Sequence, residues 1–356
     1  MSISVSHRPS QRCLSERKLV HGTLRMRKKR YLFTVGACSL IICSLLITLP
    51  WCAPAKRDEI VFAGTHANIA GLRYVADARG LFEKNGLSVT IKNFQSGPLS
   101  LKELESGAAD VATLADFPFV ANSFKTGNLK IVGTLARGGG MQIIARRDSG
   151  IMKPADLLGR TVAVTKGTIA QFFLGAYCQR NAVAYDRIRV VYLPPQEIVE
   201  AIKKGTVNAA CVWSPFIEQI RDYLGDDGVL LPSYGRTDYY ALLVTRDDVL
   251  REKPAVIGRL LKTMIDAETF AREHPDEAMQ IVAKGIGLTI DQIRRGWAES
   301  RYEVRLDQDL LTLMEAEAQW MIRNNLTEKK EMPNYLDMLY LKGLKAVKPE
   351  AVGIIH

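Results

Sequence analysis

The sequence predicts an α/β protein with two lobes, each a mostly parallel sheet flanked by helices, and a ligand cleft between the lobes. Short runs rich in Val and Ile alternate with helical patterns, as they do in successive βα units. The 356 residues suit two compact lobes better than one core, and 47% are hydrophobic, an ordinary share for a globular protein. One βα unit also recurs with similar sequence 98 residues further on.

The first series of elements ends near the glycine-rich bend 138–140. Branched and aromatic residues dominate its short runs, which favours strands. Asn85-Gly86 is a turn signal that ends the first helix. The predicted strands are 59–63, 87–94, 110–115, 129–136 and 141–146, and the predicted helices are 67–84, 98–106 and 117–125.

A second series repeats the alternation and is followed by a helical region from residue 254 to the end. Within that region, 291–297 and 307–322 have clear amphipathic patterns. The predicted strands of the second series are 160–165, 188–193, 208–213, 229–232 and 239–245, and its predicted helices are 153–158, 168–180, 195–204 and 214–224.

The internal repeat relates residues 104–118 to residues 202–216. Each copy contains a helix, a glycine, a strand, and a turn with Pro and Phe. Chance similarity between ordinary βα units is one explanation. Two equivalent lobes are the other, since the copies fall at the same stage of each series. We expect an export segment at 1–55, a first lobe built from 58–143 and 237–356, and a second lobe at 144–236.

The positive charge of the chain is confined to its head. The formal net charge is +10, but residues 1–57 hold eleven Lys and Arg against one acid, so the remainder is neutral. Bulk charge therefore gives the body no reason to bind nucleic acid, and we expect no nucleic-acid partner.

The head has the order of an export signal. A basic cluster at 25–30 precedes an uncharged run at 31–53, and Ala53-Pro54-Ala55 supplies small residues for cleavage. Three alternatives stay open: a cleaved signal, an uncleaved anchor long enough to span a bilayer, or lipid attachment at a cysteine. All three place the body outside the cytoplasm, with membrane contact only through this segment. Residues 1–25 have no foldable pattern, so Met26 is a candidate for the true start.

The body lacks the residue patterns of common enzyme and metal sites. Cys178 and Cys211 are its only cysteines and form no Cys-x-x-Cys motif, so we expect buried, inert thiols. His66, His274 and His356 do not share metal-ligand spacing, and no nucleophile elbow, P-loop or His-Glu-x-x-His motif occurs. We therefore expect no catalytic residue, no cofactor and no metal.

The body resembles a known family of binding proteins. Matching stretches occur at 80–87, 107–112, 149–164, 166–168 and 205–216, within roughly 58–280. In order and spacing they are similar to substrate-binding proteins of ABC importers of the nitrate, sulfonate and taurine type, a branch of the type II periplasmic-binding fold that includes thiamin-precursor binders. Relatives often carry an acid between the Trp and the Pro of the last stretch, where this chain has Ser214.

The resemblance implies a monomer that captures a small anionic or zwitterionic solute, such as a sulfonate, taurine or nitrate, and delivers it to an ABC permease. One alternative is a membrane-anchored ligand sensor or scaffold. Another is an enzyme of the same fold, of the type found in menaquinone or thiamin-precursor synthesis.

Ligands of open α/β sheets bind beyond the carboxyl ends of the strands, which places the candidate site residues. Thr168 is either a helix N-cap or part of an anion site, and Trp213 either a core aromatic or a cleft wall. Asp116 either caps a helix or binds an amine, and strand alternation lets only one of Tyr239 and Tyr240 face the cleft. The candidates are Thr65, His66, Ala67, Asp116, Gly167, Thr168, Gln171, Trp213, Ser214, Tyr239 and Tyr240.

Overall fold

The structure is a computed structural model and describes residues 57–138, 141–232 and 238–355. The predicted export segment, the candidate start at Met26, and Gly139 and Gly140 of the predicted bend lie outside these residues. The described residues belong to one compact unit, Lys56–His356. Within the described ranges, no helix is both long and apolar enough to cross a membrane.

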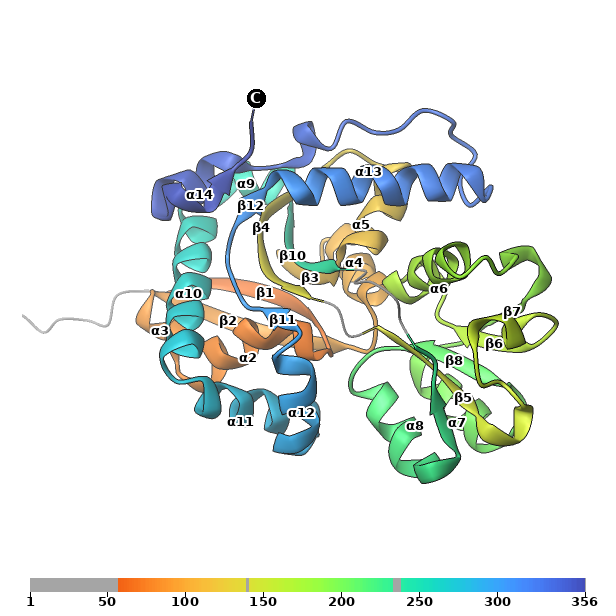
Figure 1. Ribbon diagram of the computed structural model, residues 1–356. Coiled ribbons are helices and arrows are strands. Elements are labelled where there is room, and N and C mark those ends of the chain that lie inside the picture. Colours follow the sequence, from red (N-terminus) through yellow and green to blue (C-terminus); the bar gives the residue numbers. More distant parts are fainter. Residues whose placement is uncertain (1–56, 139–140, 233–237, 356) are drawn as a thin grey trace, which may run out of the picture. The chain divides into compact units, whose positions relative to one another are not determined.

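The first sheet is built from both the early and the late part of the chain (Figure 1). Strand β1 pairs in parallel with β2 and β3, whereas β10 is antiparallel to both β3 and β4. Helices α2 (Gly71–Ala78), α4 (Gly97–Glu105) and α10 (Pro254–Glu273) pack on this sheet. Its strand order is β11 (Ser300–Arg301), β4 (Leu129–Gly138), β10 (Tyr239–Arg246), β3 (Val111–Ala115), β1 (Asp58–Thr65) and β2 (Leu87–Phe94).

The second sheet uses only strands from the middle of the chain. Strand β6 pairs in parallel with β7 and β8, and β5 is antiparallel to β8 and β9. Helices α6 (Ile169–Arg180), α7 (Pro195–Lys203) and α8 (Phe216–Leu224) pack on it. Its strand order is β7 (Arg189–Tyr192), β6 (Thr161–Val164), β8 (Ala209–Val212), β5 (Gln142–Arg146) and β9 (Gly228–Leu230). We call each sheet with its helices the first and second lobe; the exact lobe boundaries stay a prediction.

Both sheets are mixed, so the prediction of mostly parallel sheets was wrong in that respect. Strands β5 and β10 directly follow the two passages of the chain between lobes, and each runs antiparallel to its new neighbours. Sequence alternation shows that a strand exists but does not show its direction. The repeat corresponds to equivalent positions: β3 and β8 each lie between a parallel and an antiparallel neighbour, and each follows a glycine with positive φ, Gly107 or Gly205.

The first predicted helix, 67–84, is divided into three pieces. Gly80 adopts φ 61°, a left-handed conformation that interrupts the helical hydrogen bonds. The pieces are η1 (Asn68–Ala70), α2 (Gly71–Ala78) and α3 (Leu81–Lys84), and the next helices are α4 (Gly97–Glu105) and α5 (Asp116–Ser123). The predicted helix at 153–158 is a short 3₁₀-helix, η3 (Pro154–Leu157).

The C-terminal region is helical as predicted but also contributes short strands that were not predicted. Strand β12 (Leu306–Asp307) pairs in parallel with β13 (Val352–Gly353), and β11 joins the first sheet. The helices are α9 (Asp247–Glu252), α10 (Pro254–Glu273), α11 (Pro275–Ile286), α12 (Ile290–Trp297), α13 (Gln308–Arg323) and α14 (Leu341–Val347). The remaining 3₁₀-helices are η2 (Arg147–Ser149), η4 (Tyr185–Arg187), η5 (Gly225–Asp227), η6 (Leu336–Met338) and η7 (Pro349–Ala351).

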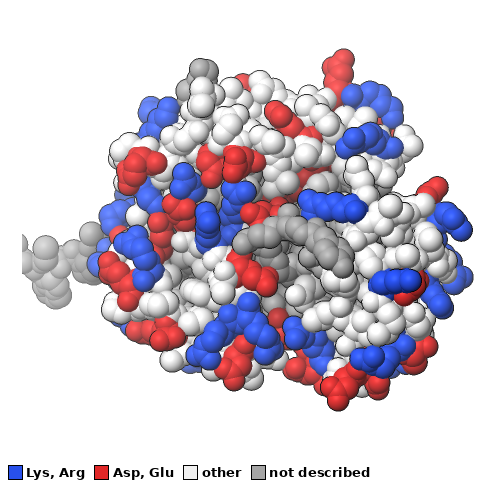
Figure 2. Space-filling model, viewed as in Figure 1, with Lys and Arg blue, Asp and Glu red and all other residues white. Residues whose placement is uncertain are grey.

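Helix α13 connects the two lobes through one aromatic side chain. The Trp320 ring lies 5.8 Å from that of Phe117 on α5 and 5.6 Å from that of Phe172 on α6. On the face drawn in Figure 2, Lys and Arg are interspersed with Asp and Glu, in keeping with the neutral charge of the body. No single-sign patch on that face points to a polyanionic partner.

Candidate functional site

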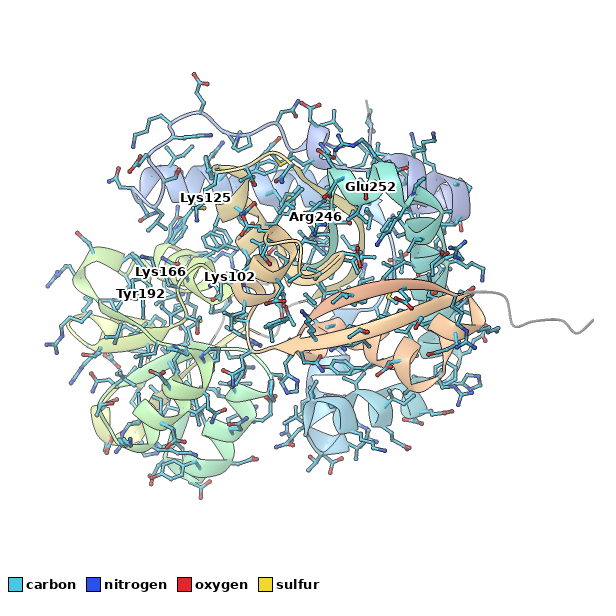
Figure 3. All side chains as sticks on the ribbon, turned by 180° about the vertical axis from the view of Figure 1, so that it is seen from behind. Lys102, Lys125, Lys166, Tyr192, Arg246 and Glu252 are labelled. Carbon is cyan, nitrogen blue, oxygen red and sulfur yellow. The ribbon has the colours of Figure 1, made fainter. Side chains whose placement is uncertain are left out.

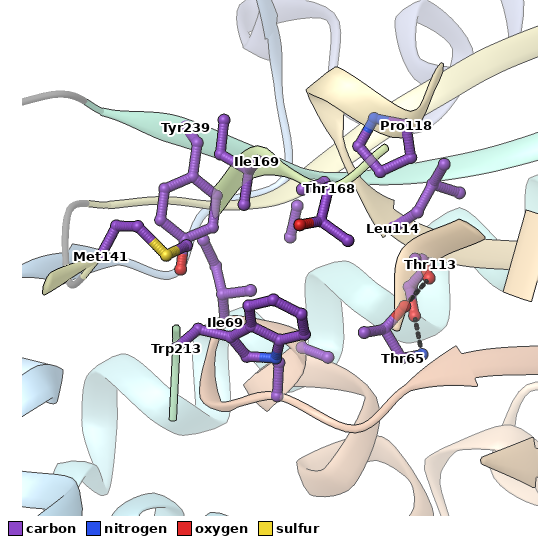
Figure 4. A pocket seen from close by; sticks show the side chains of 15 residues that line it. Thr65, Ile69, Thr113, Leu114, Pro118, Met141, Thr168, Ile169, Trp213 and Tyr239 are labelled. Carbon is purple, nitrogen blue, oxygen red and sulfur yellow. Dashed lines mark hydrogen bonds between the residues drawn. The ribbon is translucent and has the colours of Figure 1, made fainter. Parts of the chain in front are cut away.

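A pocket lies where the carboxyl ends of strands from both sheets meet (Figure 4). Its volume is about 40 Å³, room for a few water molecules. Carbon atoms make up most of its wall. The lining residues are Thr65, Ala67, Ile69, Ala70, Gly97, Thr113, Leu114, Ala115, Pro118, Met141, Thr168, Ile169, Trp213, Tyr239 and Ala241.

Three helical segments begin at this pocket. Ala67 precedes η1, Gly97 is the first residue of α4, and Thr168 precedes α6, and all three line the wall. Backbone N–H groups in the first turn of a helix have no partner within that helix, and the helix dipole adds partial positive charge there. The pocket therefore suits the negative end of a ligand although no charged side chain occurs among its lining residues.

The first-lobe wall is held by a hydroxyl network. Thr65 Oγ1 donates to the Thr113 carbonyl at 2.6 Å and lies 3.1 Å from Ser100 Oγ. The Thr65 N–H donates to Thr113 Oγ1 at 3.2 Å. Thr65 lines the pocket with its hydroxyl hydrogen already committed to the protein, so its main contribution to a ligand is shape.

His66 is next to the lining but does not belong to it. Its Nδ1 lies 3.3 Å from the Tyr74 hydroxyl, and the ring also bonds to the Ile286 backbone. Burial, together with the charge of Arg73, lowers the pKa of His66. The side chain thus turns toward α2 and α11, while its neighbour Ala67 lines the pocket.

Asp116 is fully buried behind the lining. Its carboxyl group accepts the Phe117 N–H at 2.9 Å and the Tyr240 N–H at 2.7 Å, and so ties α5 to β10. Burial raises the pKa of Asp116 to about 7. In this conformation the carboxyl group is not part of the wall that an amine would contact.

Of the two neighbouring tyrosines, Tyr239 lines the pocket and Tyr240 points to the other side of β10. The Tyr240 hydroxyl donates to Asp307 Oδ1 at 3.0 Å. The pair shows the alternation expected of a strand. Burial raises the pKa of Tyr239.

The start of α6 differs from the predicted N-cap. The Thr168 hydroxyl donates to the Thr165 carbonyl at 2.7 Å and makes no cap hydrogen bond, so the helical N–H groups that it would have capped stay available. The Gly167 N–H donates to Gln171 Oε1 at 2.8 Å, and Gln171 Nε2 donates to the Tyr192 hydroxyl at 3.1 Å. Figure 3 shows Tyr192 with Lys166, whose Nζ lies 5.7 Å from the ring centre. Gly167 and Gln171 therefore support the turn from behind and do not line the pocket.

Trp213 forms the second-lobe wall. It is 5% exposed, and its Nε1–H has no hydrogen-bond partner among the residues that the structure describes. The neighbouring Ser214 hydroxyl donates to Glu218 Oε1 at 2.6 Å, while Glu218 Oε2 lacks a partner among those same residues. Burial raises the pKa of Glu218. Ser214 does not line the pocket, but it holds the acid of the first turn of α8, Glu218.

The structure thus brings Thr65, Ala67, Thr168, Trp213 and Tyr239 together and leaves the other candidates behind the wall. Which of them contact a ligand stays a prediction. Sequence reasoning did not select the apolar lining, because an Ile or Leu at a strand end looks like any core residue. The lining residues missed were Ile69, Ala70, Gly97, Thr113, Leu114, Ala115, Pro118, Met141, Ile169 and Ala241. Among the described residues, no group of three or more His, Cys, Asp or Glu could hold a metal ion.

The chain forms two mixed sheets covered by helices, passes twice between them, and has a pocket at strand ends of both. This arrangement defines a two-lobed protein of the periplasmic-binding type. Residues 66–278 match the model of the NMT1/THI5-like family, and the chain belongs to that family.

Relatives of this chain include several binding proteins. A Brucella abortus protein named only as a binding protein is 24% identical over 216 residues, 59% of this chain and 66% of the relative. The chain therefore spans slightly less than two thirds of that relative's length. A Bacillus subtilis protein named for binding aliphatic sulfonates is 25% identical over 283 residues, 76% of this chain and 82% of the relative.

Solved structures confirm the fold. The alkanesulfonate-binding protein SsuA of Xanthomonas axonopodis pv. citri, bound to MOPS, superposes with a TM-score of 0.70 at 19% identity, covering 80% of this chain and 99% of that one. The desulfurization enzyme DSZB superposes with a TM-score of 0.58 at 19% identity, covering 77% and 94%. The fold therefore serves both binding and catalysis, and the function has to be argued from the pocket.

Proposed function

We propose that this protein is an extracytoplasmic solute-binding protein that captures a small organic anion of the sulfonate class and delivers it to an ABC importer. The observation that carries the proposal is the Trp213 indole in the pocket wall. Its Nε1–H has no partner among the described residues. A buried donor without a partner is unfavourable, so a ligand that accepts a hydrogen bond from it gains affinity.

The chemistry of the wall supports an anionic head on an apolar body. The head would accept hydrogen bonds from Trp213 and from the N–H groups at the starts of η1, α4 and α6. Within the described residues, no side chain caps these N–H groups at the start of η1, α4 or α6. Ile69, Met141 and the rings of Trp213 and Tyr239 would enclose the carbon body.

The relatives point in the same direction. Both the Bacillus subtilis relative and the Xanthomonas structure carry names that refer to sulfonates. Sulfonate and nitrate both carry three acceptor oxygens, but nitrate has no carbon body to occupy the apolar wall. Delivery to a permease, the monomeric state and the form of the N-terminal attachment belong to this proposal.

The wall offers little chemistry for catalysis. Its lining residues include no Asp, Glu, His, Lys or Cys, and burial raises the pKa of Tyr239, its one titratable side chain. Nucleophilic catalysis needs an activated nucleophile with a base in reach, and acid–base catalysis needs a group that titrates near the working pH. This composition favours binding over an enzyme of the same fold.

Calorimetric titration with alkylsulfonates, aromatic sulfonates, taurine, carboxylates, nitrate and pyrimidines tests the proposal. We expect a sulfonate to bind most tightly. Trp213→Phe keeps an aromatic ring but removes the N–H, and should weaken sulfonate binding about tenfold or more, the effect of losing a hydrogen bond to a charged group.

Trp297→Phe is the matched control. Trp297 stacks on Tyr302, with ring centres 4.1 Å apart, and does not line the pocket. The Trp297→Phe substitution should leave the sulfonate affinity unchanged. Equal losses in the two variants, or tight binding of a pyrimidine with no sulfonate binding, would contradict the proposal.

A further inference from the structure

Arg73 is a buried cation next to the pocket. It lies in the first turn of α2, only 1% exposed, and ranks among the largest fully buried side chains. Arginine is almost never fully buried in a protein unless a partner neutralises it. The surroundings of this guanidinium therefore require an explanation.

No acid among the residues that the structure describes forms an ion pair with Arg73. Nε and Nη2 have no hydrogen-bond partner within the described part of the chain. Tyr74 lies beneath the guanidinium, 4.0 Å from ring centre to Cζ, and Asp77 on the same helix acts through its charge alone. Burial lowers the pKa of Arg73, as expected for a cation taken out of water. Keeping such a group buried disfavours the ligand-free protein.

The guanidinium lies beside Gly64, the residue before Thr65 of the pocket wall. A Cβ atom on Gly64 would lie 2.7 Å from Arg73 Nε, so a side chain there would require the guanidinium to shift. Gly64 directly precedes Thr65, and Ala70 lies three residues before Arg73 on the same face of the helical segment. Thr65 and Ala70 both line the pocket. Long helical side chains also lean toward the N-terminus of their helix, which here is the pocket end.

We propose that Arg73 is the specificity-determining cation that makes this apolar pocket select an anionic head group. The inference rests on the proposed function and deepens it by naming the group that rejects neutral analogues. A charge behind a low-dielectric wall acts over several ångströms without touching the ligand. The ligand's negative charge would in turn compensate the buried guanidinium, which has no counter-ion in contact with it among the described residues.

The test compares benzenesulfonate with benzenesulfonamide, which share the aromatic body and differ in head-group charge. Affinities for both are measured calorimetrically on the purified full chain as the natural sequence and as Arg73→Met, Arg73→Lys and Arg79→Met. Arg79 lies at the end of the same helix, is exposed and pairs with Glu277 at 2.9 Å, so it serves as the control. Thermal unfolding of each ligand-free variant is measured in parallel.

We expect Arg73→Met to lower the ratio of sulfonate to sulfonamide affinity at least about tenfold, while Arg73→Lys keeps most of that ratio and Arg79→Met all of it. Arg73→Met should also raise the unfolding temperature of the ligand-free protein, because it replaces an uncompensated charge by an apolar chain. If Arg73 only stabilised the fold, Arg73→Met would instead lower the unfolding temperature of the ligand-free protein.

Two results would overturn the inference, and they can be told apart. If the natural sequence prefers the sulfonate and Arg73→Met keeps that preference, Arg73 is not the selecting cation and the proposed function stands. If the natural sequence binds the sulfonamide as well as or better than the sulfonate, or binds neither, the anionic ligand class fails together with the role of Arg73. Should Arg73→Met not fold, the ratio in Arg73→Lys and its salt dependence decide between these outcomes.

Discussion

Asp116 and Glu317 are two fully buried carboxyl groups that face each other behind the pocket. Neither carboxyl oxygen of Glu317 has a hydrogen-bond partner among the described residues. As carboxylates both groups could only accept hydrogen bonds, so a bond between them requires a proton on one of the two. Burial and the neighbouring charge of Asp116 raise the pKa of Glu317 well above its usual value, and burial raises that of Asp116 to about 7. Two acids this close titrate as a coupled pair.

The pair should make stability depend on pH. Because the folded-state pKa values lie above the unfolded ones, the stabilisation is complete below about pH 4 and is lost as pH rises through the folded-state values. We expect the free energy of unfolding to fall from pH 5 to pH 8. In Glu317→Gln that fall should be smaller by about 1 kcal/mol or more.

Denaturant titrations at several pH values measure this difference. Glu315→Gln, an exposed acid on the same helix, is the control and should follow the natural sequence. An unchanged pH profile in Glu317→Gln would show that the pair does not share a proton.

At the scale of elements, α13 and α6 approach so closely that only glycine fits between them. A Cβ atom on Gly175 would lie 2.3 Å from the Trp320 ring. Trp320 also contacts Phe117, Phe172 and Tyr185, so its ring cannot move without disturbing three neighbours. The junction between the lobes therefore depends on the small size of Gly175 and on the large ring of Trp320.

Gly175→Ala should destabilise the protein by about 1–3 kcal/mol, the usual effect of overpacking. Gly258→Ala on α10 is the matched control. No atom lies within 4 Å of its would-be Cβ, so helix propensity alone should stabilise the protein by about 0.5–1 kcal/mol. Chemical denaturation measures both. Stabilisation in both variants would mean that Trp320 moves aside freely.

The elements were predictable where a local signal was strong. The strand at 87–94 matches β2 without error, and 291–297 and 307–322 match α12 and α13 within one residue. The single helix at 67–84 was wrong because Gly80 can continue a helix in sequence terms, and its left-handed φ becomes visible only in the structure. The two-residue strands β12 and β13 are too short for any alternation to show.

At the scale of the whole molecule, the small volume of the pocket sets a requirement on ligand entry. A volume of about 40 Å³ is well below the roughly 300–1,000 Å³ of typical ligand sites. A sulfonate with a carbon body therefore needs the lobes to separate before it can enter. Small-angle scattering should show a larger radius of gyration for the ligand-free protein than for the sulfonate-saturated one.

A scattering titration with a compound that does not bind provides the baseline radius of gyration. A radius of gyration that stays constant through saturation would mean that local side-chain movement, not lobe separation, admits the ligand.

The location of the site could be predicted from sequence better than its surface. Strand-end reasoning led to Thr65, Thr168 and Trp213, which the fold brings together from both lobes. It could not decide which way each side chain points. His66 and Asp116 also lie at strand ends, yet neither lines the pocket. Tyr74 contacts the His66 ring, and two backbone N–H groups donate to the Asp116 carboxyl group. Only Tyr240, 124 residues from Asp116, comes from a distant part of the chain; Tyr74 and Phe117 are near in sequence, but nothing in the sequence shows which way His66 and Asp116 turn.

Trp213 also gives the protein an optical reporter of its own occupancy. Indole emission responds to hydrogen bonding and polarity at the ring, and this ring forms part of the pocket wall. Trp297 and Trp320, the other tryptophans in the described ranges, pack against Tyr302 and Phe117 and do not line the pocket. A chain in which Trp213 is the sole emitter would convert binding into a change of colour or brightness without any attached dye. The fold would then serve as a scaffold for a reagentless sensor of organic anions.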